Sequence, residues 1–173
     1  DALAVDDRAF ALVPQAGAAP AELVRGQAVV LVPREHIAAA LLTLRDHPDI
    51  QCTQLMDVTG VDYLGRTPRF EVVYQLLSFP LRHRLRVKVA LAEDDAVIPS
   101  AVAVWKSANW AEREVFDMFG IRFTGHPDLR RILMYESFEG HPLRKDYKLD
   151  RRQPLVPERD PIEHPWFPKA KGA

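Results

Sequence analysis

The chain has 173 residues and a mass of 19.6 kDa, which is enough for one domain of ordinary size around a single core. Hydrophobic residues make up 47% and charged residues 27% of the sequence, and no apolar run reaches the ~20 residues that a membrane span requires. The net charge of −1 argues against nucleic acid as a partner, and the single cysteine, Cys52, excludes an iron–sulfur cluster held by four thiolates.

The first part of the chain predicts a strand, a helix and a second strand. Residues 28–32 form an unbroken apolar run, which is typical of a strand buried on both faces. Apolar residues at helical spacing predict a helix over 33–47. Residues 51–63 predict a strand that bends around Gly60. Cys52 in this strand is interpreted as a small buried hydrophobe.

A β-hairpin follows. Residues 69–77 alternate in polarity only loosely, whereas in 84–91 apolar residues alternate strictly with Arg84, Arg86 and Lys88. The basic row could bind phosphate, but we interpret it as the solvated or partner-facing side of a half-buried strand.

Two helices come next. Ser100 is placed to cap a short helix that runs to about residue 107. Asn109 and Glu112 predict a variant of the capping box at the start of a second helix, which Gly120 ends. An apolar stripe along the second helix leaves Glu112, Arg113 and Asp117 off its centre. The run of Glu112, Arg113 and Glu114 could be an acid/base cluster, but ion pairing at the surface or at an interface is expected instead.

Two similar loops follow the second helix. Residues 125–131 and 140–146 both begin with Gly-His-Pro and end with charged residues that include a basic pair. Glycine permits a tight turn and proline fixes the next backbone angle, so each loop is predicted to present cations rigidly. Between the loops, residues 131–135 predict a short strand, and Phe138 is an expected anchor.

The C-terminal segment differs in composition from the rest. Five of the 14 prolines fall in the last 20 residues, which predicts an extended segment. Trp166 and Phe167 favour an arm that wraps a partner over a disordered terminus. The sequence therefore predicts an α+β body over 1–143, with a mixed or antiparallel sheet, a few helices and a loop-rich segment, and an extended tail over 144–173.

The sequence resembles one family over three segments: Asn109–Ile121, Gly125–Leu133 and Glu139–Tyr147. The family is the 30 kDa (C-type) subunit in the peripheral arm of respiratory complex I, NADH:quinone oxidoreductase. Looser similarity extends upstream through 55–63. The resemblance thus covers most of the predicted body.

The resemblance implies a non-catalytic assembly subunit that binds no cofactor or metal itself. It implies docking beside the 49 kDa large subunit of the quinone site and beside cluster-bearing subunits, while FMN and the iron–sulfur clusters lie in other subunits. Membrane contact would come only through the complex, on the cytoplasmic side of a bacterial inner membrane or the matrix side of a mitochondrial one. The alternative is the equivalent subunit of a related membrane-bound hydrogenase or chloroplast-type dehydrogenase.

Several residues invite a functional interpretation. His126 and His141 could bind a metal, but their spacing lacks a ligand pattern, so each imidazole is expected to hydrogen-bond loop backbone instead. An RNA-binding domain and a small enzyme acting through His126 are both disfavoured. The candidate residues for a partner interface are Arg113, His126, Arg130, Arg131, Phe138, His141, Arg144, Lys145, Trp166 and Phe167.

Overall fold

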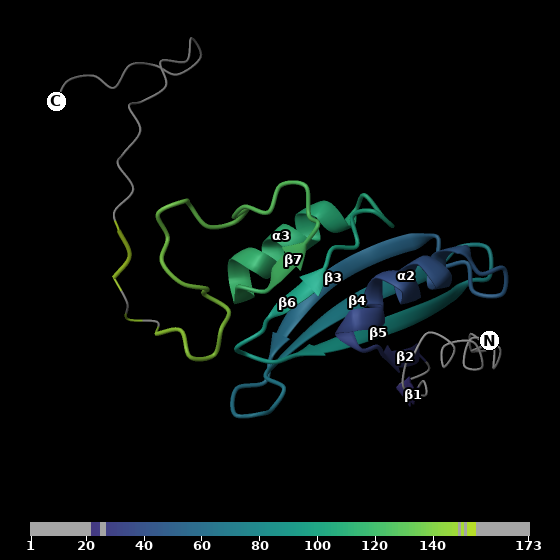
Figure 1. Cartoon of the computed structure of the whole chain (residues 1–173), viewed down its shortest axis with the longest axis horizontal. Helices are drawn as coiled ribbons and strands as arrows, with labels where there is room; N and C mark the ends of the chain where they lie inside the picture. The colour runs from purple at the N-terminus through teal and green to yellow at the C-terminus, as the bar shows by residue number, and fades with distance from the viewer. Residues whose placement is uncertain (1–21, 25–26, 149, 151, 155–173) are drawn as a thin grey trace, which may run out of the picture.

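The computed structural model describes residues 22–24, 27–148, 150 and 152–154 (Figure 1). The helices and strands, in chain order, are β1 (Glu22–Val24), β2 (Gln27–Leu31), the 3-10 helix η2 (Arg34–His36), α2 (Ile37–Asp46), β3 (Gln54–Asp62), β4 (Phe70–Ser78), β5 (His83–Leu91), β6 (Val97–Pro99), α3 (Ala108–Phe119) and β7 (Arg122–Thr124). The α+β class is confirmed. Most of the predicted tail, with Trp166 and Phe167, lies outside the described residues.

The main sheet is mixed, with the strand order β1-β2-β5-β4-β3. β2 pairs with β5 in parallel, and the other neighbours are antiparallel. The predicted hairpin of β4 and β5 is confirmed, and Arg86 and Lys88 lie on its polar face, where Lys88 pairs with Glu71 at 2.8 Å. The three-residue β1 was not predicted.

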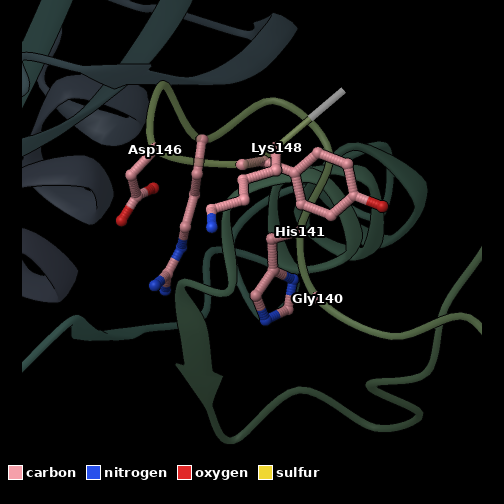
Figure 2. Close-up of a pocket in the computed structure, with 6 residues that line it drawn as sticks. Gly140, His141, Asp146 and Lys148 are labelled. Atoms are coloured by element: carbon pink, nitrogen blue, oxygen red, sulfur yellow. The ribbon is translucent and has the colours of Figure 1, made fainter. Parts of the chain in front are cut away.

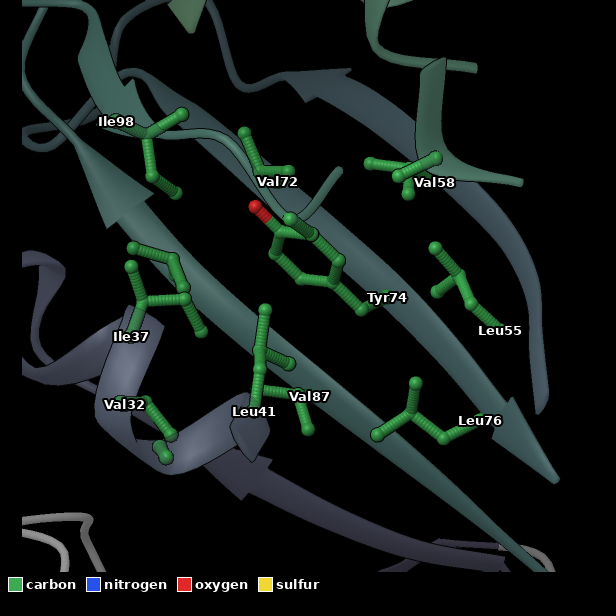
Figure 3. Close-up of a cluster of buried hydrophobic side chains, with 14 of the residues drawn as sticks. Val32, Ile37, Leu41, Leu55, Val58, Val72, Tyr74, Leu76, Val87 and Ile98 are labelled. Atoms are coloured by element: carbon green, nitrogen blue, oxygen red, sulfur yellow. The ribbon is translucent and has the colours of Figure 1, made fainter. Parts of the chain in front are cut away.

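One hydrophobic core joins the sheet to both α-helices. In Figure 3, Ile37 and Leu41 of α2 lie against the same sheet face as Tyr74 of β4 and Val87 of β5. These four side chains are almost fully buried, and α3 adds Met118 and its neighbours to the same cluster. The helical periodicity of α2 therefore serves packing on the sheet.

The β3 strand is distorted at a different place from the one predicted. The irregularity falls between Leu55 and Asp57, whereas Gly60 pairs regularly with Val72. A Cβ atom at Gly60 would lie 2.7 Å from the Phe119 ring, so the glycine is needed for close packing of α3 on β3 and not for a bend.

The predicted helix over 100–107 is wrong. Turns occupy this segment, and the preceding residues form the strand β6, which pairs in parallel with β7 as a second sheet. Ser100 Oγ accepts from the Val102 amide at 3.2 Å within a turn and does not start a helix. Neither strand has a sequence pattern, because each is only three residues long.

The start of α3 also differs from the prediction, although its end is confirmed. The helix begins at Ala108 without a side-chain cap, and Glu112 points into the protein instead of back to Asn109. At the other end, Gly120 adopts the left-handed conformation with φ 78°, and its amide donates to the Phe116 carbonyl at 2.8 Å.

Candidate partner-docking site

The two Gly-His-Pro loops lie along α3, the first beside its N-terminal half and the second beside its C-terminal end. Gly125 and Gly140 have φ values of 78° and 90°, which confirms the turns that glycine permits there. We call residues 140–148 the strap, because they cross from α3 to the ends of β3 and β4. The Leu143 amide donates to the Met118 carbonyl at 3.1 Å and starts this attachment.

Asp117 organises the first half of the loop segment. Its carboxylate is fully buried, and Oδ1 lies 2.6 Å from Arg131 Nη1. Oδ2 accepts backbone amides from three consecutive residues, Ile132, Leu133 and Met134, at 3.1, 2.8 and 2.8 Å. Burial opposes ionisation, but these amides and the guanidinium outweigh it and hold the pKa of Asp117 below its ordinary value.

This arrangement corrects the prediction of a short strand over 131–135. The segment forms bends, and the amides that a strand would place in a ladder donate to Asp117 instead. The sequence pattern did not identify Asp117, because it placed this residue only off the centre of the apolar stripe of α3. Its position beside Met118 and Phe119, both buried, is the one local indication that it points inward.

His141 and Arg144 attach the strap to the last turn of α3. His141 Nδ1 lies 2.9 Å from the Asp117 carbonyl oxygen, and Arg144 Nε donates to the Phe119 carbonyl at 2.6 Å. These contacts satisfy helix carbonyls that have no partner within the helix. Burial lowers the pKa of His141, so the imidazole is neutral at pH 7.

Arg69 forms a second, buried centre that joins four segments. Its guanidinium binds Asp62 at 2.8 and 2.9 Å, Glu93 at 2.5 Å and Asp146 at 2.7 and 3.1 Å. Asp62 also accepts the Lys145 amide at 2.8 Å. Arg69 lowers the pKa of Asp62 and Asp146 and stabilises the charged form of each. The sequence pattern did not indicate this cluster, since Arg69 and Asp146 are 77 positions apart.

The first Gly-His-Pro loop is held by the N-terminal half of α3. His126 Nε2 lies 3.1 Å from the Asn109 carbonyl, and His126 Nδ1 accepts the Asp128 amide at 3.0 Å. Arg113 donates to the carbonyls of Arg130 and Arg131, both at 3.2 Å. The expectation of hydrogen bonds to loop backbone is thus confirmed for His126, whereas His141 binds a backbone carbonyl of α3 instead.

Glu112 is fully buried, which corrects the expectation of an ion pair at the surface. Its Oε2 accepts the Ser100 hydroxyl and its Oε1 accepts the Ala101 amide, each at 2.6 Å. Burial raises the pKa of Glu112 to about 7, because these two donors compensate only part of the lost hydration. The Tyr74 hydroxyl is also buried and has no hydrogen-bond partner among the described residues.

Some of the remaining interface candidates pack against other residues of the chain, and others are exposed. Phe138 stacks on Tyr147 with ring centroids 6.1 Å apart, and the Arg131 guanidinium lies 5.8 Å from the Phe138 ring. Lys145 and Arg130 are exposed. Most of the candidates hold the loops in place, and their contact with a partner stays a prediction.

Contacts also cross the predicted boundary at residue 143. Gln153 Nε2 donates to the Glu139 carbonyl at 3.0 Å, and Tyr135 donates its hydroxyl to the Pro154 carbonyl at 2.9 Å. With the Arg69 cluster, these bonds tie Lys145, Asp146, Gln153 and Pro154 to the body. The division into body and tail stays a prediction.

A cleft of about 290 Å³ opens beside the strap (Figure 2). Its lining residues are Gly140, His141, Arg144, Asp146, Tyr147 and Lys148. In the part of the chain that the structure describes, no three His, Cys, Asp or Glu side chains are grouped to hold a metal ion. No helix among the same residues has the length and hydrophobicity to span a bilayer.

The comparison with solved structures gives the class first. The trypsin-resistant fragment of Nqo5 superposes with a TM-score of 0.62 and 36% identity, over 71% of this chain and 98% of the fragment. The fold therefore defines an α+β chain of the Nqo5 type. A chain of the membrane-bound sulfane sulfur reductase, an archaeal respiratory membrane complex, shares the fold with a TM-score of 0.61 and 23% identity, over 82% of this chain and 86% of that chain.

Sequence comparison then gives the family. The family model for the 30 Kd subunit of respiratory-chain NADH dehydrogenase matches residues 30–153, and the chain belongs to this family. The C-type subunit of NADH-quinone oxidoreductase from Citrifermentans bemidjiense is 53% identical over 139 residues, which are 80% of this chain and 82% of that protein. Its counterpart from Trichlorobacter lovleyi is 57% identical over 126 residues, or 72% and 76% of the two chains. The resemblance seen in the sequence is thus confirmed.

Proposed function

We propose that the chain is a non-catalytic subunit that shapes the peripheral arm of NADH-quinone oxidoreductase. It docks beside the large subunit of the quinone site and helps to hold the cluster-bearing subunits in place. In this role it binds no cofactor of its own, while FMN and iron–sulfur clusters are carried by other subunits. The complex would hold it on the cytoplasmic or matrix side of the membrane.

One observation carries the proposal: the polar side chains of the family signature are engaged with the chain's own loops. Asp117, Arg131 and His141 bind backbone or each other, so they shape a surface and are not directed at a substrate. Apolar side chains remain exposed around them, with Trp110 72% and Leu143 54% accessible. A rigid surface with exposed apolar residues favours docking to another protein.

The test uses the intact complex purified in mild detergent through a tag on this chain. We expect the flavin-binding, NADH-binding and quinone-site subunits to copurify in fixed stoichiometry, and the isolated chain to contain neither flavin nor iron. Trp110→Ala should reduce incorporation, whereas Leu42→Ala, which truncates another exposed apolar residue on α2, should not. A stoichiometric flavin, metal or nucleotide in the isolated chain would refute the non-catalytic role.

The alternative is the equivalent subunit of a related membrane complex. This alternative is supported by the fold that the chain shares with the sulfane sulfur reductase chain, although the two sequences are only 23% identical. The same purification distinguishes the two. A nickel hydrogenase subunit in place of the NADH-binding subunit would support the alternative.

A further inference from the structure

The lining of the cleft beside the strap has a net positive charge, from two cations and the single carboxylate of Asp146. Four carboxylates around the strap are engaged within the chain: three of them bind Arg69, and the buried Asp117 binds Arg131 and three amides. Arg144 and Lys148 also line the cleft. Among the described residues, neither of these two cations forms an ion pair within 4.0 Å.

Arg144 lines the cleft and is held in a fixed orientation. Its Nε donates to the Phe119 carbonyl, and its guanidinium lies 5.1 Å from the centre of the Phe70 ring. These contacts position the group but leave its terminal nitrogens without an acceptor in the described part of the chain. A guanidinium held in this way can bind a carboxylate through both nitrogens with little loss of conformational entropy.

The rest of the lining suits a single anion. A carbonyl oxygen can only accept, so His141 donates its Nδ1 proton to the Asp117 carbonyl, and burial, which lowers the pKa of His141, disfavours a second proton on Nε2. Asp146 also lines the cleft, and its carboxylate binds Arg69, while both Arg69 and Arg144 lower its pKa. Arg144 and Lys148 both line the cleft drawn in Figure 2, so a bound anion would meet two cations.

We propose that this cleft is a socket for one Asp or Glu side chain of a neighbouring subunit, which Arg144 and Lys148 hold by charge-assisted hydrogen bonds. The inference rests on the proposed function, because the acid belongs to a partner in the complex. Leu143, which directly precedes the lining residue Arg144 and is 54% exposed, is an apolar side chain that a docked protein surface would cover. A free inorganic anion would leave this leucine in water.

The decisive experiment is zero-length carbodiimide cross-linking of the purified complex, which joins a lysine only to a carboxylate in contact with it. We expect mass spectrometry to find Lys148 joined to one Asp or Glu of another subunit. Cross-links of Lys148 only to Glu158, Asp160 or Glu163 of this chain would overturn the socket, since the chain's own C-terminal segment would then fill it. Reaction at Lys145 with none at Lys148 would overturn it as well.

Two variants add a quantitative readout. Lys148→Met should lower the fraction of chain recovered in the complex by about tenfold and leave the melting temperature unchanged. Lys145→Met, at an exposed strap residue outside the cleft lining, should stay within about twofold of the wild type. Equal recovery of both variants would refute the socket but not the docking role. Loss of the wild-type chain from the complex would instead refute the proposed function.

Discussion

Asp117 is the residue whose contacts hold the loop segment together. It is fully buried and accepts four hydrogen bonds, one from Arg131 and three from backbone amides. Asp117→Asn should lower the free energy of unfolding by about 2–4 kcal/mol. The asparagine side chain carries no charge, and its NH2 group would face backbone N–H groups or Arg131, which are donors themselves. Urea denaturation of the purified chain measures this value.

The matched control is Asp57→Asn, which makes the same change at an exposed position on β3. Its unfolding free energy should stay within about 0.5 kcal/mol of the wild type. If Asp117→Asn is equally mild, the Asp117 contacts do not stabilise the fold and its organising role is wrong.

Glu112 makes stability depend on pH near neutrality. Its pKa is raised to about 7 in the folded chain from an ordinary value of 4.5, so the folded state holds the proton more tightly than the unfolded state does. The corresponding stabilisation is complete below pH 4.5 and is lost as the pH rises through 7. Over that interval the unfolding free energy should fall by about 3 kcal/mol relative to Glu112→Gln.

Denaturation curves of the wild type and Glu112→Gln at several pH values between 4.5 and 8 give this difference. Subtracting the two removes the opposite contribution of His141, whose lowered pKa makes its stabilisation decline as the pH falls. Glu114→Gln, at an exposed position of the same helix, is the control. A difference that does not change with pH would show that Glu112 titrates normally.

At the scale of elements, the end of α3 and the strap form one unit. A Cβ atom at Gly120 would lie 2.6 Å from His141 Nε2 and 2.7 Å from Arg144 Nη2, in a backbone with φ 78°. Gly125 has the same φ and nothing within 4 Å of the added atom. Gly120→Ala should therefore destabilise the chain by at least about 1 kcal/mol more than Gly125→Ala.

Thermal denaturation of both variants checks this prediction. Gly125→Ala carries only the cost of the left-handed backbone, so the difference between the variants isolates the packing of the strap on the helix. Equal melting temperatures would show that the strap moves away without cost. Hydrogen exchange at residues 143–147 should also be faster in Gly120→Ala than in the wild type.

At the scale of the whole molecule, the last residues are predicted to act in assembly more than in folding. Gln153 and Pro154 contact the body, so a truncation that separates the two roles begins at residue 155. Deleting 155–173 should leave the melting temperature within about 2 °C and reduce incorporation into the complex several-fold. Normal incorporation of the truncated chain would show that the predicted arm is dispensable.

Long periodic segments were predictable from the sequence, whereas short or irregular ones were not. The apolar pattern of α2 and the alternation in β5 each repeat several times, so they identified a helix and a strand. β6 and β7 have three residues each, and only their pairing with each other makes them strands. The same limit produced the wrong helix over 100–107, where apolar residues at helical spacing belong to turns.

The sequence by itself determined the family, the α+β class and the turns of the two Gly-His-Pro loops, because those depend on residue order and on local backbone preferences. Only the tertiary structure decided what the charged residues do. Glu112 and Asp117 differ in their surroundings, since one meets two neutral donors and the other a guanidinium and three amides. The charge state of a buried carboxylate depends on its hydrogen-bond and ion-pair partners. These partners are distant in the sequence, so the residues next to the carboxylate do not reveal them.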